Sequence, residues 1–248
     1  MRRLLPWLTF LMTLVLWHLA IRTAGTSVLP SPLEVAGGIA ELAKNGLLSR
    51  YIVASLYRVT IGFGLAVLVA VPLGLLLGWF GLAFHALNPL IQTVRPISPI
   101  AWIPLAILWF GVTDWAPIFL IFLASVFPIT VSGIAAVRSL NPVHLRAARN
   151  FELSGFELFA RVVLPGALPQ LLTGIRIALG IAWLVLVAAE MIAVNSGLGY
   201  LIIDARNAGK RYDLVVAGMV LIGLIGLGLD WLVRRLEMFD EVRWAHAS

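Results

Sequence analysis

The chain has 248 residues, of which 61% are hydrophobic and 12% charged, whereas ordinary soluble domains carry about 25% charged residues. This composition excludes an ordinary soluble domain and predicts an all-α polytopic membrane protein. The net charge of +6 does not indicate nucleic-acid binding, because Lys and Arg lie in loops and at helix ends rather than among aromatic residues on one surface. The absence of cysteine excludes disulfides, thiolate metal sites and cysteine nucleophiles.

Six segments have the apolar length, roughly 20 residues, that a helix needs to cross about 30 Å of hydrocarbon. In chain order they are residues 4–21, 55–80, 87–110, 115–137, 168–194 and 214–233. The charged start of the first segment is typical of a signal peptide, but no small-residue cleavage site follows cleanly. We therefore interpret it as an uncleaved first span, which gives about six transmembrane helices.

The distribution of Lys and Arg indicates the orientation of these spans. With both termini inside, the inner segments hold nine such residues and the outer segments six. The inner set is Arg2, Arg3, Arg138, Arg146, Arg149, Arg161, Arg234, Arg235 and Arg243, and the outer set is Arg22, Lys44, Arg50, Arg206, Lys210 and Arg211. Because cytoplasmic loops are enriched in Lys and Arg, we expect both termini in the cytoplasm.

The chain divides into three parts. Residues 1–54 hold the first span and an outer segment, residues 55–235 form the core, and residues 236–248 form a cytoplasmic tail. In the outer segment, the sequence Leu29-Pro30-Ser31-Pro32 precedes apolar residues at helical spacing, Val35, Ile39, Leu42 and Ala43. This pattern predicts a helix that lies on the outer surface.

Three prolines, Pro96, Pro99 and Pro104, interrupt the third span. Each removes a backbone hydrogen bond and disfavours helix at the residue before it. Irregular backbone at membrane depth survives where protein or water covers it, so the pattern favours a kinked path beside a cavity. Simple kinked packing is the alternative, since proline is tolerated in membrane helices.

Small residues in two other spans predict close helix packing. Gly74 and Gly78 have GxxxG spacing, and the last span contains Gly223, Gly226 and Gly228. The last set is not a dinucleotide-binding fingerprint, because no strand precedes it.

Residues 138–165, which we call the polar segment, hold six of the chain's charged residues between two apolar spans. Asn141-Pro142 is typical of an N-cap and first position of a short helix. Ser154 and Glu157 have capping-box spacing, which predicts a second helix that ends before Leu164-Pro165. Two short amphipathic helices between spans suggest a docking site for a protein partner.

Four ionisable residues, Arg95, Arg176, Glu190 and Asp230, lie within or beside spans, where such groups are functional candidates. Arg176 can extend to the inner surface, and Asp230 has Arg234 one turn later as a partner, so structural roles are favoured for both. Arg95 can attract an anion and Glu190 can bond Arg or Trp groups of a gate. Plain pairing between helices is the equal alternative for these two.

The sequence contains no recognisable catalytic or metal-binding pattern. The four histidines, His18, His85, His144 and His246, are far apart and have no carboxylates at ligand spacing. Ser132 lacks the first glycine of a nucleophile elbow. We therefore expect no enzymatic activity and no cofactor in this chain.

Three stretches, residues 95–111 (RPISPIAWIPLAILWFG), 163–169 (VLPGALP) and 186–191 (LVAAEM), occur in order around the polar segment. Together they resemble the permease subunits of ATP-binding-cassette importers for sulfonates, taurine and nitrate. The resemblance runs from about Ser55 to Arg235 and implies a type I importer permease fold. Residues 193–200 (AVNSGLGY) are more similar to the sulfonate branch than to the nitrate branch.

The family's cytoplasmic signature is Glu-Ala-Ala, three residues, Gly, then a hydrophobic stretch to Leu-Pro. Arg146, Ala147 and Ala148 occupy the first triplet here, and Glu152 stands at the usual glycine. The resemblance implies that the polar segment couples to an ATPase. The residues assigned to this role are Arg146, Ala147, Ala148, Glu152, Ser154, Gly155, Leu164 and Pro165, and those assigned to the pathway or gate are Arg95, Pro96, Pro99, Trp102, Arg176 and Glu190.

The resemblance further implies a permease homodimer in the bacterial inner membrane, bound to two cytoplasmic ATPase subunits and supplied by a periplasmic solute-binding protein. ATP and Mg²⁺ are expected on the ATPase, because this chain has no phosphate-cradling Gly-x-x-x-x-Gly-Lys-Ser/Thr loop. The alternative function is a secondary transporter driven by an ion gradient, although we find no internal repeat of the kind common in that class. An intramembrane enzyme lacks a paired acid, nucleophile or metal set.

Overall fold

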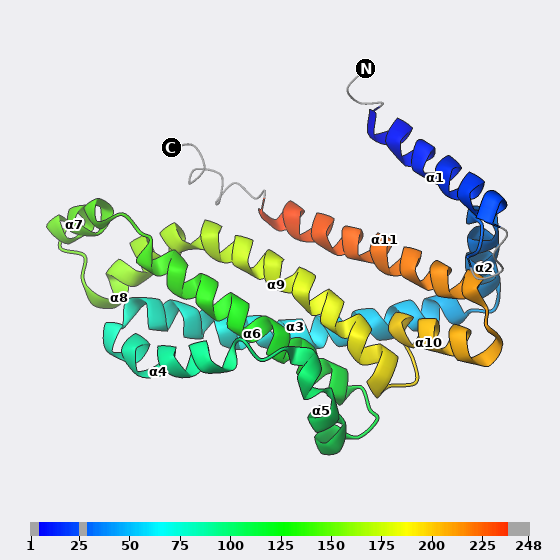
Figure 1. Ribbon diagram of the computed structural model, residues 1–248. Coiled ribbons are helices and arrows are strands. Elements are labelled where there is room, and N and C mark those ends of the chain that lie inside the picture. Colours follow the sequence, from blue (N-terminus) through cyan, green and yellow to red (C-terminus); the bar gives the residue numbers. More distant parts are fainter. Residues whose placement is uncertain (1–4, 25–28, 238–248) are drawn as a thin grey trace.

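The computed structural model describes residues 5–24 and 29–237 (Figure 1). Every regular element in these ranges is a helix, which confirms the predicted all-α class. In chain order the elements are α1 (Leu5–Ala24), α2 (Pro32–Lys44), α3 (Leu47–Trp79), α4 (Gly81–Val94), η1 (Pro99–Trp102), α5 (Ile103–Phe110), α6 (Trp115–Arg138), α7 (Pro142–Asn150), α8 (Gly155–Leu158), η2 (Phe159–Val163), α9 (Leu164–Ala193), α10 (Leu198–Gly209) and α11 (Tyr212–Glu237).

Among the described residues, four helical segments are individually long and apolar enough to cross a membrane. They are α3, α6, the run Gly155–Ala193 formed by α8, η2 and α9, and Tyr212–Arg235 of α11. The bent pair of α4 with η1–α5 makes a fifth if it is counted as one span. The remaining predicted span is helical as α1, but its described apolar stretch, Leu11–Ile21, is shorter than a span. Six crossings therefore stay a prediction for the N-terminal helix.

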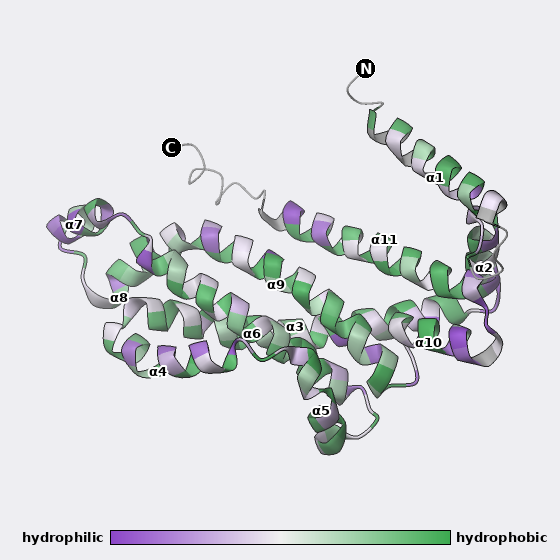
Figure 2. Ribbon diagram, viewed as in Figure 1, coloured by the Kyte–Doolittle hydropathy of each residue, from purple (hydrophilic) through white to green (hydrophobic). Residues whose placement is uncertain are grey.

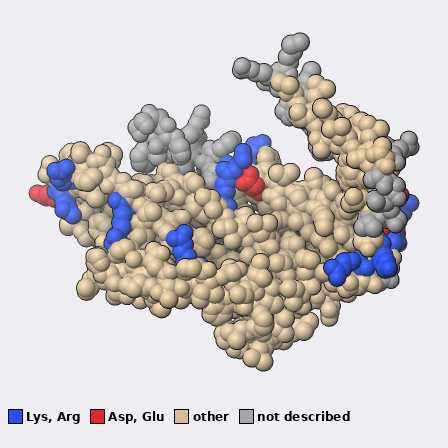
Figure 3. Space-filling model, in the orientation of Figure 1, with Lys and Arg blue, Asp and Glu red and all other residues tan. Residues whose placement is uncertain are grey.

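The surface of the molecule is suited to lipid. Figure 2 shows hydrophobic residues along α3, α6, α9 and α11 and hydrophilic residues on α7. On the face drawn in Figure 3, Lys and Arg lie singly or in small groups on a surface formed mostly by uncharged residues. Large apolar side chains such as Leu68, Leu108 and Leu184 are exposed. Exposed apolar area of this extent is expected of a chain surrounded by hydrocarbon or by partner subunits.

Helices α3, α6 and α9 form the core of the fold and pack along most of their length. Close contact between α3 and α6 depends on glycine, as predicted. A Cβ atom at Gly74 would lie 2.7 Å from the carbonyl oxygen of Thr130, and one at Gly78 would lie 2.6 Å from the Cβ of Val137. In α11 only Gly226 fulfils the prediction, against Trp183, since Gly223 and Gly228 face open space within the described chain.

We expect Gly74→Ala to destabilise the fold by about 1–3 kcal/mol, because the added methyl group would force the backbone of α6 away from α3. Gly64→Ala is the matched control on the same helix, where a Cβ atom meets nothing within 4 Å. That substitution should be neutral or stabilising by up to ~1 kcal/mol, since alanine favours helix. Unfolding midpoints in detergent, followed by circular dichroism, measure both. Equal midpoints would contradict the close packing.

The third predicted span is broken where its prolines lie. Helix α4 begins at Gly81 rather than at residue 87, and an angle of 79° separates it from the η1–α5 unit. Pro96 lies within the bend, and Pro99 directly after it starts the 3-10 turn η1, where its missing amide costs no hydrogen bond. The predicted kinked path is confirmed, and the break is sharper than a kink within one helix.

The first helix of the polar segment forms as predicted. The side chain of Asn141 accepts a hydrogen bond from the amide of Val143 at 2.9 Å, and Pro142 is the first residue of α7. The capping box predicted at Ser154 is wrong. The amide of Glu157 donates to the backbone oxygen of Ser154 instead, and the Glu157 carboxylate pairs with Arg161 at 3.1 Å. Both capping partners therefore have other contacts.

The prediction that the second helix ends before Leu164-Pro165 is also wrong. A π-helical turn, η2, connects α8 directly to α9, so that Gly155–Ala193 is one helical run. The amide of Leu164 donates to the carbonyl of Phe159, five residues earlier. This wider turn accommodates Pro165 near the start of α9, where the absent amide is tolerated.

Two helices lie beside the long spans at the end of the molecule opposite α7 (Figure 1). Helix α2 was predicted, and it begins with a capping box between Ser31 and Glu34. Helix α10 was missed, although its buried residues Leu198, Leu201, Ile202 and Ala205 have helical spacing. The short turn before α10 returns the chain to α9, which positions the site described next.

Candidate functional site

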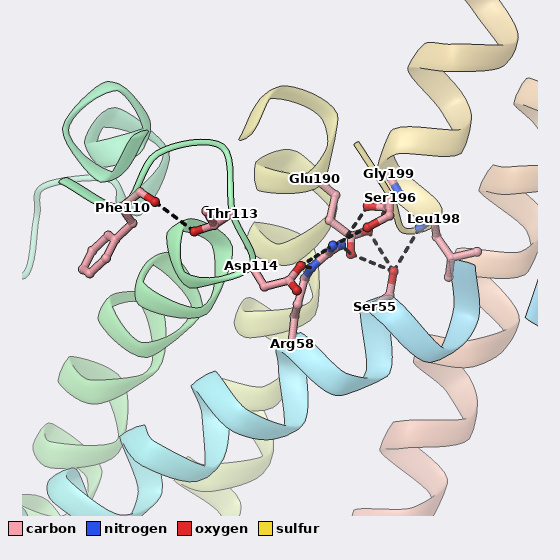
Figure 4. A network of polar contacts seen from close by, with 9 residues as sticks. All are labelled: Ser55, Arg58, Phe110, Thr113, Asp114, Glu190, Ser196, Leu198 and Gly199. Atoms are coloured by element: carbon pink, nitrogen blue, oxygen red, sulfur yellow. Dashed lines mark hydrogen bonds and ion pairs between the residues drawn. The ribbon is translucent and has the colours of Figure 1, made fainter. Parts of the chain in front are cut away.

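A buried ionic network joins α3, α9 and the turns before α6 and α10 (Figure 4). Its centre is Arg58 of α3, which is 1% exposed, and its main partner is Glu190 of α9, which is fully buried. Nη1 of Arg58 lies 2.6 Å from a carboxylate oxygen of Glu190. Nε and Nη2 both donate to Oδ1 of Asp114, at 2.8 and 2.6 Å.

Every oxygen of the Glu190 carboxylate has a donor. Ser55, one turn before Arg58, lies 2.8 Å from both oxygens, and the amide of Gly199 donates to Oε2 at 3.0 Å. The hydroxyl of Ser55 accepts in turn from the amide of Leu198 at 2.9 Å. A buried carboxylate with a cation and further donors avoids the large cost of an unpaired buried charge.

The turn from residue 194 to 197 is shaped around this carboxylate. Ser196 accepts from Arg58 through both its backbone oxygen and its hydroxyl. Gly197 has a φ of 105°, and a side chain there would collide with the Glu190 carboxylate. Glycine is therefore required by both the backbone conformation and the space.

Asp114 is the part of the network that reaches the surface. Its side chain is 55% exposed, while Arg58 and Glu190 are covered. It belongs to the short loop that joins α5 to α6, in which Thr113 donates to the backbone oxygen of Phe110 at 2.9 Å. The network thus connects the broken third span to the α3–α9 core through one exposed carboxylate.

A second ion pair lies elsewhere on α9. Arg176 donates to Asp230 of α11 through Nε at 2.7 Å, and Arg234 donates to the same carboxylate at 3.0 Å. The predicted Asp230–Arg234 contact is confirmed, and Arg176 joins it. Next to this pair, α9 and α11 border a cavity of about 400 Å³ that is otherwise walled mostly by apolar residues.

A third feature is a cavity of about 240 Å³ at the bend of the third span. Its wall includes Arg95, Pro99 and Trp102, together with residues of α6 and Ile181 of α9. Pro96 is not part of the wall. Of the six residues assigned to a pathway or gate, three therefore meet at one cavity, and Arg176 and Glu190 belong to the two other places.

Charged side chains also connect α2 to the turn before α11. Arg211 lies 2.7 Å from both Glu41 and Asp213. The hydrogen bonds that Arg211 donates, first to Asp213 and then to Glu41, raise the pKa of Arg211 above its ordinary value. The guanidinium of Arg211 in turn holds the pKa of Glu41 below its usual range. These contacts hold α2 against the end of the core that carries the Arg58 network.

Comparison with known proteins is decisive for the family. Residues 70–238 match the binding-protein-dependent transport system inner membrane component. The chain belongs to this permease family. It is 37% identical over 244 residues to the aliphatic sulfonates transport permease protein SsuC of Escherichia coli, covering 98% of this chain and 92% of the relative. It is 38% identical over 219 residues to the E. coli taurine transport system permease protein TauC, covering 84% and 78%.

A third permease, the nitrate import permease protein NrtB of Leptolyngbya laminosa, is 37% identical over 182 residues, which is 73% of this chain and 65% of the relative. Among solved structures, an inward-facing conformation of the MetNI methionine ABC transporter matches with a TM-score of 0.61. The match has 20% identity and covers 76% of this chain and 95% of that chain. It shows that the fold is that of a type I ABC importer permease.

The permease signature in the polar segment lies on α7, the following turn and the start of α9. Ala148 is buried, whereas Arg146 and Ala147 are not. Glu152, at the position where the family usually has glycine, has a φ of 63°. Glu152 thus adopts the left-handed conformation that glycine takes most easily, and this permease accepts the strain of a non-glycine side chain there.

The remaining signature residues lie at the starts of α8 and α9. Gly155 has a φ of 53°, which suits glycine, and Leu164 and Pro165 continue the helix into α9. Sequence reasoning placed Phe156 on an apolar helix stripe but assigned no coupling role to it or to Phe151; the two side chains are 83% and 80% exposed on either side of the turn. The sequence does indicate such a role, because two phenylalanines in a polar segment are typical of a surface that a partner covers.

Arg58 was also missed. It lies in the predicted second span. The argument that made Arg95 and Glu190 candidates, namely that an ionisable residue within a span is a functional candidate, applies to it equally. The predicted contact of Glu190 with an arginine is formed with this residue, while its role in a gate stays a prediction. Its partner could not be named from sequence, because 132 positions separate the two.

Proposed function

We propose that this permease is the translocation subunit of an ATP-driven importer for small anions, and that it converts closure of an ATPase into alternating access. Aliphatic sulfonates are the substrate class that we favour over taurine and nitrate. The observation that supports coupling best is the exposed pair Phe151 and Phe156 on a polar helix–turn–helix. The substrate class is supported by similarity to SsuC over 98% of this chain.

The continuous helix Gly155–Ala193 supplies the mechanical connection. It has 39 residues, and at 1.5 Å per residue it extends roughly 55–60 Å. One end carries the exposed Phe156, and the other carries Glu190, which is bonded to Arg58. A displacement of the polar segment by an ATPase would therefore move Glu190 relative to α3, because a helix transmits motion along its axis with little bending.

The Arg58 network is then the outer gate. Its exposed carboxylate, Asp114, connects the bent third span to the core, so separation of Arg58 from Asp114 would free the α5–α6 loop. In this proposal both termini and the polar segment are cytoplasmic, and α2 and α10 lie on the periplasmic side of the bacterial inner membrane. Two permease copies, two ATPase subunits and a periplasmic binding protein complete the importer.

Uptake by the reconstituted importer tests this function. A strain that lacks the gene should lose growth on alkanesulfonates as sole sulfur source and keep growth on sulfate. Proteoliposomes with the permease, its ATPase and the binding protein should accumulate alkanesulfonate only with ATP. Accumulation driven by an ion gradient without ATP would instead favour a secondary transporter. Normal growth on sulfonates with loss of nitrate uptake would move the substrate assignment to nitrate.

A further inference from the structure

The cavity at the bend of the third span lies at membrane depth. Leu123 and Phe127 of its wall are in the middle of α6, and Ile181 is in the middle of α9. Arg95 therefore stands near the centre of two spanning helices rather than at their ends. A charged side chain at that depth is costly and needs a compensating partner.

Arg95 differs from the two other arginines that lie within predicted spans. Arg58 pairs with Glu190 and Asp114, and Arg176 pairs with Asp230. Within the described ranges, no hydrogen bond or ion pair engages the guanidinium of Arg95, and no acidic residue lines the cavity. The cation thus borders a cavity in which a negative partner is lacking.

The rest of the wall is apolar or aromatic. It is formed by Val94, Ile97, Trp102, Leu123, Phe127 and Ile181, among others. We propose that this cavity binds an organic monoanion with an uncharged apolar tail, with the anionic group on Arg95 and the tail against Leu123 and Phe127. This inference rests on the proposed transport function and adds a binding site and a substrate chemistry to it.

The same wall disfavours the other substrates named for related permeases. A zwitterion such as taurine would bring an ammonium group into a cavity without a carboxylate, at the cost of an unpaired charge. Nitrate would use Arg95 but leave most of the 240 Å³ unfilled. An alkanesulfonate satisfies the guanidinium and also buries its methylene groups.

Direct binding to the purified permease–ATPase complex, without the binding protein, tests the site. The complex is placed in phosphatidylcholine nanodiscs and titrated with radiolabelled hexane-1-sulfonate. Arg95→Gln should weaken binding at least tenfold, Arg95→Lys should weaken it about threefold or less, and the exposed control Arg50→Gln should leave it unchanged. Competition should strengthen about two- to fourfold per methylene from methanesulfonate to hexanesulfonate. Taurine and nitrate should compete at least tenfold more weakly than hexanesulfonate.

Several results would overturn the proposal. They are equal binding by the wild type and Arg95→Gln, equal competition by nitrate and hexanesulfonate, and no saturable binding at millimolar probe. Displacement of the probe when phosphatidylglycerol replaces phosphatidylcholine would assign the cavity to lipid headgroups. If sulfonate uptake by the full importer persists alongside any of these results, the binding site fails and the transport function stands. Loss of ATP-dependent uptake in the wild type would instead remove the proposed function.

Discussion

Arg58→Met is expected to destabilise the permease by about 3–5 kcal/mol, because it leaves the fully buried Glu190 carboxylate without a cation. Methionine keeps much of the volume of the arginine stem, so the loss reports the charge rather than a large cavity. Ser55 and the amide of Gly199 would remain as donors, but they do not neutralise the carboxylate. The midpoint of heat inactivation in detergent, followed by the folded peak in size-exclusion chromatography, measures the effect.

Two further variants separate the buried charge from general packing. Arg58→Met combined with Glu190→Gln should recover much of the lost stability, since the amide is neutral and its oxygen still accepts from Gly199. Asp114→Asn should cost less than about 1 kcal/mol, because that side chain is half exposed and the amide oxygen still accepts from Arg58. If Arg58→Met lowers the inactivation midpoint no more than Asp114→Asn does, the network does not stabilise the fold as described.

The features that were predictable from sequence depend on local chemistry. Asn141 and Pro142 start a helix with groups that lie within two residues of each other. Pro96 and Pro99 break a helix by themselves, so the bend was foreseeable, although its angle of 79° was not. The left-handed conformation at Glu152 followed from the family pattern, in which glycine is usual at that position.

The features that were missed depend on competition between several possible hydrogen-bond partners, or on contacts between residues far apart in the chain. The capping box at Ser154 has the right residues, but Arg161 takes the carboxylate of Glu157. A proline near a helix start does not distinguish a new helix from a continuing one, and the π-turn at η2 allows continuation. The Arg58–Glu190 pair joins α3 to α9 across 132 positions, which local spacing cannot reveal.

Loss of ATPase binding is the expected result of Phe151→Asp and of Phe156→Asp. Both phenylalanines are exposed on the polar segment, and we expect them to be hot spots of the ATPase interface, where loss of one side chain costs about 2 kcal/mol or more. Each substitution should therefore weaken assembly by roughly 30-fold or more. Neither should reduce the thermal stability of the isolated permease, because the side chains are not part of its core. Co-purification with a tagged ATPase and the inactivation midpoint of the permease alone measure the two effects.

The turn between the two phenylalanines supplies the controls. Glu152→Gly relieves the left-handed strain and should retain full recovery of the ATPase. If Glu152 meets a basic surface of the ATPase, Glu152→Lys should reduce recovery more than Glu152→Gly does, whereas equal recovery removes that electrostatic role. Because the chain has no cysteine, single cysteines at Arg146 or Glu152 should cross-link to a cysteine-bearing ATPase. Labelling of these cysteines only from the periplasmic side would reverse the topology and exclude coupling through this segment.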